Sequence, residues 1–354
     1  MPKITIAKKA IESTATLFFF AGLFAYIAWP WLNGFRLKEP PPHTLVVYGF
    51  SILQEVMSGR IFPAFQRHYQ QKTNKRIQIL GSFSGSGTTT NHILMGAPAQ
   101  VALLSTPGNA ARLKQAGLVR TDWASFPFRG VIARTPVVIL VRHGNPKGIH
   151  DFSDLVRDPI AIIHPDPLTS GGALWAILAE YGSALTRSEA QWGRPDRSAA
   201  FLQLEGIWRR ITALTGSARG ARTQFDSGFG DALVTYEQEA VSDMRLHRFS
   251  AELIMPWATI FTEPLAVIVD RNVSEADRPI VNEFVNYLWS DAAQFILVDE
   301  GFRSVTHESF NHESPYFQPM AHPFTIADLG GWDRAYDTII REIWEKQILQ
   351  ELRP

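Results

Sequence analysis

The stretch ILGSFSGSGTTTNHILMG, residues 79–96, joins an apolar run to a turn of glycines and hydroxyl residues and then to a short amphipathic segment. This order is typical of a strand that turns into a helix, and such a turn offers backbone N–H groups to an anion. It is not a P-loop, since no lysine follows the glycines. It is not a nucleophile elbow either, because Phe83 stands midway between Gly81 and Gly85. A hydroxyl-rich turn that only caps a helix remains the alternative for this segment alone.

Two later segments repeat the pattern. The first is HPDPLTSGGALWAILAEYG, residues 164–182, in which Ser170, Gly171 and Gly172 lead from an apolar strand into a helix. The second is TGSARGARTQFDSGFGDALVTYEQEA, residues 215–240, which places small residues before a helix and then a strand. The first N–H groups of a helix lack intrahelical partners and lie at its positive end. We therefore expect the three helix starts to converge on one dianion.

Two arginines in the third segment leave two interpretations open. Arg219 and Arg222 lie among the small residues of that turn. A guanidinium group at such a position either contacts the anion directly or closes an ion pair between two lobes of the protein. The sequence alone does not decide between these roles.

The composition excludes several classes of function. The chain has 354 residues, a formal net charge of zero and no cysteine, which excludes disulfides, thiolate zinc sites and a thiol nucleophile. No basic stripe stands out, so we expect no nucleic-acid partner. No His, Asp or Glu pattern has metal-ligand spacing, and no Ser/His/acid set is favoured. We therefore expect no metal, no cofactor and no catalysis.

The N-terminus carries an export signal of some kind. Residues 13–35 contain no charged side chain and follow a lysine-containing segment. A signal peptide and a membrane anchor both begin this way. Small residues are poorly placed for cleavage, so we expect an uncleaved anchor, with a cleaved signal as the alternative. In both cases the rest of the chain lies outside the cytoplasm, and residues 38–43 form a stiff proline-rich linker.

The remaining chain alternates strand-like and helix-like runs, which predicts an α/β protein with mostly parallel sheets. The predicted strands are residues 44–50, 76–83, 101–106, 135–144, 159–164, 231–237 and 263–271. The predicted helices are residues 51–71, 88–96, 108–116, 172–182, 198–214, 275–298 and 333–352, the last packing on a lobe. The two longest strands, 135–144 and 263–271, are interpreted as the segments that leave one lobe and return to it.

This pattern resembles the periplasmic sulfate/thiosulfate-binding proteins of ABC importers. The resemblance covers roughly residues 44–305 and is strongest in four motifs. They are ILVRHGNPKGIHDFSDLV (139–156), HPDPLTSGGALW (164–175), GSARGARTQFDSGFGDALVTYEQEA (216–240) and FTEPLAVIVDRNV (261–273). The earlier segment 84–105 is also similar to molybdate-binding proteins. The resemblance implies a type II periplasmic-binding fold, in which two lobes close on an oxyanion.

On this resemblance the chain divides into four parts. They are an N-terminal signal or anchor with its linker (1–43), the first part of lobe 1 (44–134), lobe 2 (135–258), and the return to lobe 1 with a C-terminal helix (259–354).

The resemblance also implies a set of ligand-binding residues. Carried over position by position, they are Ser51, Ser86, Gly87, Thr88, Ser170, Gly171, Gly172, Ala218, Arg219 and Tyr236. Tyr236 stands where the family has a tryptophan that donates its indole N–H. Ser51 falls on a family aspartate, and Asp166 replaces a neutral asparagine. An acceptor carboxylate at Asp166 suits a protonated anion such as hydrogen phosphate, whereas a cap at Asp166 leaves sulfate favoured.

The expected function is therefore capture of a tetrahedral oxyanion, most simply sulfate or thiosulfate. The closed monomer would deliver the anion to an ABC permease in the inner membrane. Phosphate, molybdate or an organic sulfonate as ligand is the first alternative, and a membrane-anchored anion sensor is the second. An enzyme is the third.

Overall fold

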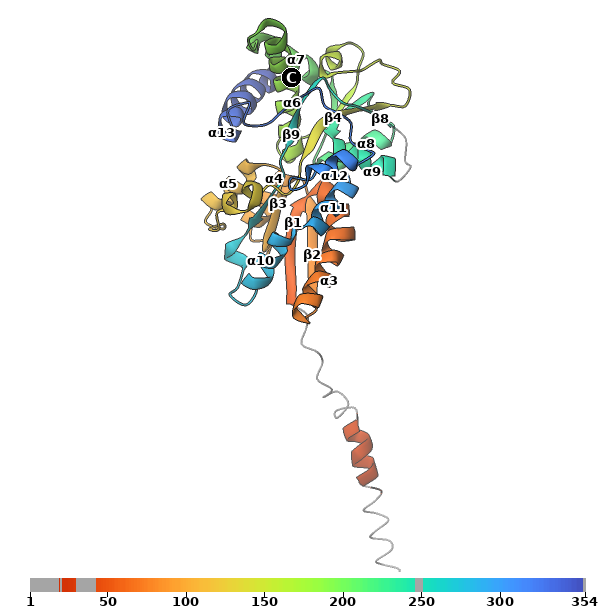
Figure 1. The fold of residues 1–354 in the computed structure, drawn as a ribbon, viewed down its shortest axis with the longest axis vertical. Helices are drawn as coiled ribbons and strands as arrows, with labels where there is room; N and C mark the ends of the chain where they lie inside the picture. The colour runs from red at the N-terminus through yellow and green to blue at the C-terminus, as the bar shows by residue number, and fades with distance from the viewer. Residues whose placement is uncertain (1–18, 20, 30–42, 246–250, 353–354) are drawn as a thin grey trace, which may run out of the picture. The chain divides into compact units, whose positions relative to one another are not determined.

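The computed structural model describes residues 19, 21–29, 43–245 and 251–352, and the chain forms two compact units, residues 1–43 and 44–354 (Figure 1). In the first unit, residues 21–29 are helical and largely exposed. No helix among the described residues has both the length and the apolar character that crossing a bilayer requires. Most of the uncharged run 13–35, on which the anchor was predicted, lies outside the described residues.

The second unit contains a smaller sheet whose strands come from segments far apart in the chain. Its strand order is β10-β3-β1-β2, where β1 is His43–Phe50, β2 is Ile77–Ser84, β3 is Val101–Leu104 and β10 is Leu265–Ile268. Strands β1 and β3 are parallel, and β10 returns antiparallel to β3. The helical segments of this lobe are η1 (Ser51–Leu53), α2 (Gln54–Val56), η2 (Met57–Ile61), α3 (Phe62–Thr73), α4 (Ser86–Leu94), α5 (Pro107–Gln115), η3 (Trp123–Ser125), η4 (Pro127–Gly130), η6 (Asp270–Asn272), α10 (Arg278–Tyr287), α11 (Asp291–Asp299) and α12 (Glu308–Glu313).

A larger sheet forms the second lobe. Its order is β11-β9-β4-β7-β5-β6, and β8 also pairs with β4. The strands are β4 (Thr135–Arg142), β5 (Ile162–Pro165), β6 (Ile211–Thr215), β7 (Ala232–Tyr236), β8 (Ala251–Ile254), β9 (Ala258–Thr262) and β11 (His322–Phe324). The helical segments are η5 (Phe152–Val156), α6 (Gly171–Trp192), α7 (Arg197–Trp208), α8 (Ala218–Asp226), α9 (Glu237–Arg245), α13 (Trp332–Ala335), η7 (Tyr336–Ile348) and α14 (Leu349–Leu352).

The α/β class is confirmed, but the prediction of mostly parallel sheets is wrong. The central strand β4 is antiparallel to β7, β8 and β9, whereas β5 is parallel to β6 and β7. The alternation of strand-like and helix-like runs predicts only the parallel strand pairs that are connected through a helix. Strands β8 and β9 are short, and the sequence pattern did not predict them. Strand β6 overlaps the end of the predicted helix 198–214, because its β-branched residues pair with β5.

The chain passes between the lobes three times, at the end of the first part of lobe 1, between β9 and β10, and between α12 and β11, and the first two passages are paired. Thr135, at the start of β4, pairs with Thr262, at the end of β9, and the Thr262 hydroxyl donates to the Thr135 carbonyl at 2.7 Å. Residue 265 then joins the smaller sheet. The outgoing and returning chains are therefore bonded to each other where they cross, which is the arrangement that a hinge requires.

The C-terminal segment packs on the second lobe. Strand β11 joins the larger sheet beside β9, and η7 contacts both α6 and α7 (Figure 1). The rings of Trp344 and Trp208 meet edge to face with centroids 4.9 Å apart. The prediction that this amphipathic helix packs on a lobe is confirmed.

We expect Phe284→Ala to lower the free energy of unfolding by about 3–5 kcal/mol, because it removes a fully buried ring from the core. The Phe284 ring lies 5.1 Å from that of Phe65 and 5.9 Å from that of Phe62. Urea denaturation measures the change. The control Phe295→Ala removes a ring that is 59% exposed and should change stability by about 0.5 kcal/mol. Equal effects of the two substitutions would contradict the assigned core.

Candidate functional site

Three helices begin where the two lobes meet. Helix α4 begins at Ser86 after β2, α6 begins at Gly171 after β5, and α8 begins at Ala218 after β6. The first N–H groups of each helix have no intrahelical acceptor and lie at the positive end of the helix dipole. The three predicted turns therefore each lead into a helix, and the contacts described next bring the three starts together.

Glycines allow the start of α4 to touch the second lobe. The Gly87 and Thr88 N–H groups donate to the Thr169 carbonyl at 3.0 and 3.3 Å. A Cβ built on Gly85 would lie 2.5 Å from the carbonyl oxygens of Thr169 and Gly216. No side chain fits at this distance. The first turn of α4 is thus capped by a carbonyl from the α6 turn in this structure.

A hydroxyl network continues this contact. The Ser86 hydroxyl donates to Asn109 Oδ1 at 2.9 Å and accepts from the Ser105 N–H at 3.0 Å. The Ser105 Oγ lies 3.0 Å from the Tyr236 hydroxyl, and the Trp175 indole N–H donates to the Ser105 carbonyl at 2.8 Å. Ser105 therefore joins predicted site residues from both lobes.

Sequence reasoning did not select Ser105. It lies just after β3, within the predicted strand 101–106. The available signal was a hydroxyl residue at the carboxyl end of a buried parallel strand, which is where ligands bind in open α/β sheets.

The glycines of α6 face the same network. A Cβ on Gly171 would lie 2.8 Å from Ser105 Oγ, and a Cβ on Gly172 would lie 2.9 Å from the Tyr236 hydroxyl. The backbone of α6 therefore approaches these hydroxyl groups as closely as a ligand-binding turn requires.

The Tyr236 side chain is fully enclosed. Burial raises the pKa of its hydroxyl, despite the opposing hydrogen bond from Ser105. The hydroxyl consequently stays protonated throughout the neutral range and remains available as a neutral donor.

Two other predicted residues lie beside this network. Ser170 caps α6 by position, is 4% exposed, and its hydroxyl makes no hydrogen bond within the described residues. Ser51 is buried at the start of η1, and η1 contacts α8, the helix that begins at Ala218. Within the described residues, the Ser170 hydroxyl is thus a donor without a protein acceptor.

Arg219 bridges the lobes. Its guanidinium pairs with Glu239 at 3.1 Å in the second lobe and with Glu55 in the first lobe. Burial lowers the pKa of Arg219, but the charges of Glu239 and Glu55 more than offset this and leave it raised. Of the two interpretations open in the sequence, this geometry favours the ion pair between lobes.

Arg222 has a different role from Arg219. It donates to the Glu239 carbonyl at 2.7 Å and pairs with Asp226 at 2.8 Å, both within the second lobe. The first of these contacts joins α8 to α9, the second lies within α8, and neither involves a group of the first lobe.

Asp166 caps the turn that precedes α6, whereas the N-cap residue of α6 itself is Ser170. Its side chain accepts from the Leu168 N–H at 2.9 Å, and its carbonyl accepts from the N–H groups of Thr169 and Ser170. This is the alternative that leaves sulfate favoured, because the carboxylate is engaged by its own turn.

Among the residues that the structure describes, no group of three or more His, Asp or Glu side chains is placed to hold a metal ion. The site consists of helix starts, hydroxyl groups and the two ion pairs of Arg219 with Glu239 and Glu55. Helix starts and hydroxyl groups are donors, and donors are what an anion requires of a binding site.

Comparison with known proteins identifies the class. The chain belongs to the family described as bacterial extracellular solute-binding protein, which it matches over residues 45–303. Membership confirms a solute-binding protein that acts outside the cytoplasm and is not an enzyme.

Individual relatives agree with this class. The chain is 30% identical to a sulfate-binding protein of Escherichia coli over 77% of this chain and 82% of that protein. It is 29% identical to an Escherichia coli thiosulfate-binding protein over 80% and 85% of the two chains. The solved sulfate-binding protein SubI from Mycobacterium tuberculosis superposes on this chain with a TM-score of 0.74 at 28% identity. The superposition covers 83% of this chain and 98% of SubI.

We expect Gly85→Ala to hold the two lobes apart, because the added Cβ would meet two backbone oxygens at 2.5 Å. Small-angle X-ray scattering should detect a larger radius of gyration, and the Gly87 N–H should exchange faster with deuterium. The control is Gly59→Ala, since a Cβ there meets nothing within 4 Å. Scattering identical to that of the unsubstituted protein would refute the contact.

Proposed function

We propose that this protein captures sulfate or thiosulfate between its two lobes and delivers it to an ABC importer. The names of its relatives support this ligand class, since they are sulfate- and thiosulfate-binding proteins from several bacteria. The observation that carries the proposal is the meeting of three helix starts, at Ser86, Gly171 and Ala218, between the lobes.

The chemistry of these groups fits a fully ionised oxyanion. Sulfate has only acceptors, so backbone N–H groups and hydroxyls satisfy it without a cation. We infer the ligand-binding residues to be Ser51, Ser86, Gly87, Thr88, Ser170, Gly171, Gly172, Ala218 and Tyr236, joined by Ser105. Arg219 is assigned to closure and not to contact with the anion.

Binding and release require the lobes to separate. The donors at Gly87, Thr88 and Ser86 are engaged by protein acceptors in this structure. An entering anion must replace part of these bonds, so the lobes open for entry and close around the ligand. The paired segments at Thr135 and Thr262 form the axis of this movement.

We also propose that the protein stays tethered to the inner membrane by its uncharged N-terminal segment, residues 13–35. The length of this run and its poor cleavage sites support an anchor. Tethering would keep the binding unit near its permease and raise the local concentration of the captured anion.

We expect Ser170→Ala to weaken sulfate binding by about 1–3 kcal/mol, measured by titration calorimetry, because the anion loses one donor. Ser170 makes the cleaner test than Ser86, whose removal also deprives Asn109 and Ser105 of partners. The matched control Ser198→Ala changes an exposed serine in the first turn of α7. Unchanged affinity in Ser170→Ala would remove that residue from the site.

We expect sulfate affinity to be nearly constant between about pH 5.5 and about pH 8, because neither sulfate nor the Tyr236 hydroxyl titrates there. Phosphate, whose second pKa lies near about 6 by analogy with phosphorylated side chains, gains charge across this range. Calorimetric titrations with sulfate, thiosulfate and phosphate across this pH range distinguish a sulfate-binding site from a phosphate-binding site. Binding of phosphate alone, increasing with pH, would replace the proposed ligand.

A further inference from the structure

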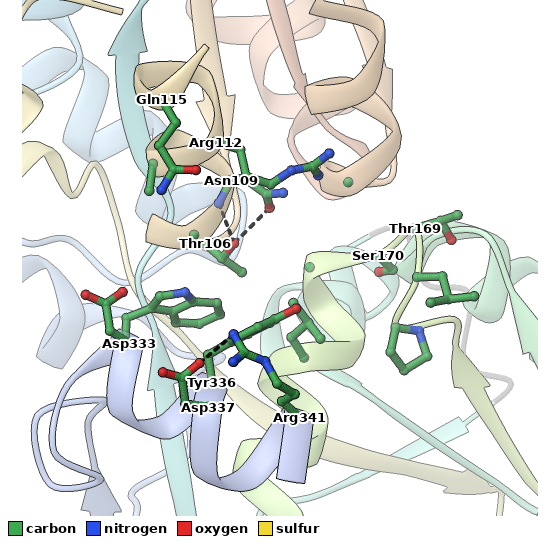
Figure 2. Close-up of a pocket in the computed structure, with 18 residues that line it drawn as sticks. Thr106, Asn109, Arg112, Gln115, Thr169, Ser170, Asp333, Tyr336, Asp337 and Arg341 are labelled. Carbon is green, nitrogen blue, oxygen red and sulfur yellow. Dashed lines mark hydrogen bonds and ion pairs between the residues drawn. The ribbon is translucent and has the colours of Figure 1, made fainter. Parts of the chain in front are cut away.

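A cavity of about 520 Å³ adjoins the anion site (Figure 2). It shares Gly87, Ser170 and Gly171 with the proposed ligand-binding residues. Its walls come from α5, the turn before α6, and the C-terminal segment that begins at Trp332. A ligand held at the start of α6 therefore borders an open space of considerable size.

The volume of this cavity is larger than a tetrahedral oxyanion would fill. Cavities of about 300–1,000 Å³ are typical of organic ligands and bury most of the ligand surface. Sulfate is one sulfur atom with its oxygens, and it needs only the helix starts. The remaining volume suits an organic group attached to the anion.

One wall of the cavity is aromatic. The rings of Trp332 and Tyr336 stack with centroids 6.3 Å apart, and Trp332 is held edge to face against Trp175 at 5.3 Å. The Arg341 guanidinium lies 5.9 Å from the Tyr336 ring and pairs with Asp337 at 2.7 Å. This wall is therefore a supported aromatic surface on which the Arg341 charge is paired, and the Asp333 carboxylate also lines the cavity beside Trp332.

Another part of the lining is apolar. It is made by Pro167, Leu168 and Leu174, and the Leu168 side chain is 71% exposed. Arg112 stands at the α5 side, donates to Asn91 at 2.7 Å, and has no ion-pair partner within the described residues. The cavity thus combines a cation, an aromatic face and aliphatic side chains.

We propose that this cavity receives the organic body of an aryl sulfonate or aryl sulfate ester whose oxyanion occupies the helix starts. The ring would stack on Trp332 and Tyr336 and cover the leucines, which a bare oxyanion leaves in contact with water. Arg112 supplies positive charge to the cavity lining. This inference rests on the proposed oxyanion function and specifies a further ligand class for the same site.

The test compares ligands that share one head group. Full-length protein is titrated calorimetrically with sulfate, methanesulfonate and benzenesulfonate. Stacking and apolar burial should make benzenesulfonate bind about tenfold tighter than methanesulfonate. Equal affinities of the two sulfonates, with sulfate binding intact, would overturn the cavity assignment and leave the proposed function standing. Failure of all three to bind would overturn both.

A cavity-filling variant locates the effect. Ala111 lines the cavity on α5, and Ala116, at the end of the same helix, is exposed and does not line it. Ala111→Phe should abolish the preference for benzenesulfonate and leave the sulfate affinity within about twofold. Ala116→Phe should change neither. If Ala111→Phe keeps the full preference, the ring binds elsewhere and the inference is wrong.

Tyr336→Leu provides a second route if Ala111→Phe fails to fold. This substitution removes the Tyr336 ring from the aromatic wall, and the Tyr336 side chain is partly exposed. The benzenesulfonate advantage should fall by at least about threefold, while sulfate affinity stays unchanged. An undiminished advantage would contradict the stacking that the inference requires.

Discussion

The close approach of two backbones, at Gly85 and Thr169, is the constraint on which this structure depends. The N–H groups of Gly87 and Thr88 reach the Thr169 carbonyl only because Gly85 has no side chain. This contact brings the starts of α4 and α6 together, and Gly216 brings the turn before α8 to the same place. A site made of helix starts requires such proximity, since each helix contributes few donors.

The same proximity explains why the lobes act as one unit. The Ser105 carbonyl accepts a hydrogen bond from the Trp175 indole N–H, and the Ser105 hydroxyl is hydrogen-bonded to the Tyr236 hydroxyl. Arg219 forms an ion pair with Glu55 across the interface between the lobes. These contacts link the lobes through hydrogen bonds between buried groups at Ser105 and through an ion pair in which the Glu55 side chain is half exposed. A ligand that supplies acceptors of its own competes with them directly, which couples anion binding to the opening and closing of the lobes.

The sequence predicted the features that are local. Glycine and hydroxyl turns between an apolar strand and a helix were recognisable at Ser86 and Ser170, and both positions begin or cap helices in the structure. The partners of these turns were not recognisable. Ser105 and Glu55 lie in segments with no turn signal of their own, and the antiparallel direction of β4 depends on pairing with strands far along the chain.

By itself, the sequence determined the α/β class and the three glycine and hydroxyl turns, because periodicity and turn chemistry act over a few residues. The family followed from the resemblance of four longer motifs to known proteins. Only the tertiary structure decided that Arg219 bridges lobes, that Asp166 caps its own turn, and that Trp332 borders a cavity beside the site. Those roles are set by distances between segments remote in the chain. Such distances follow from packing, which no local pattern encodes.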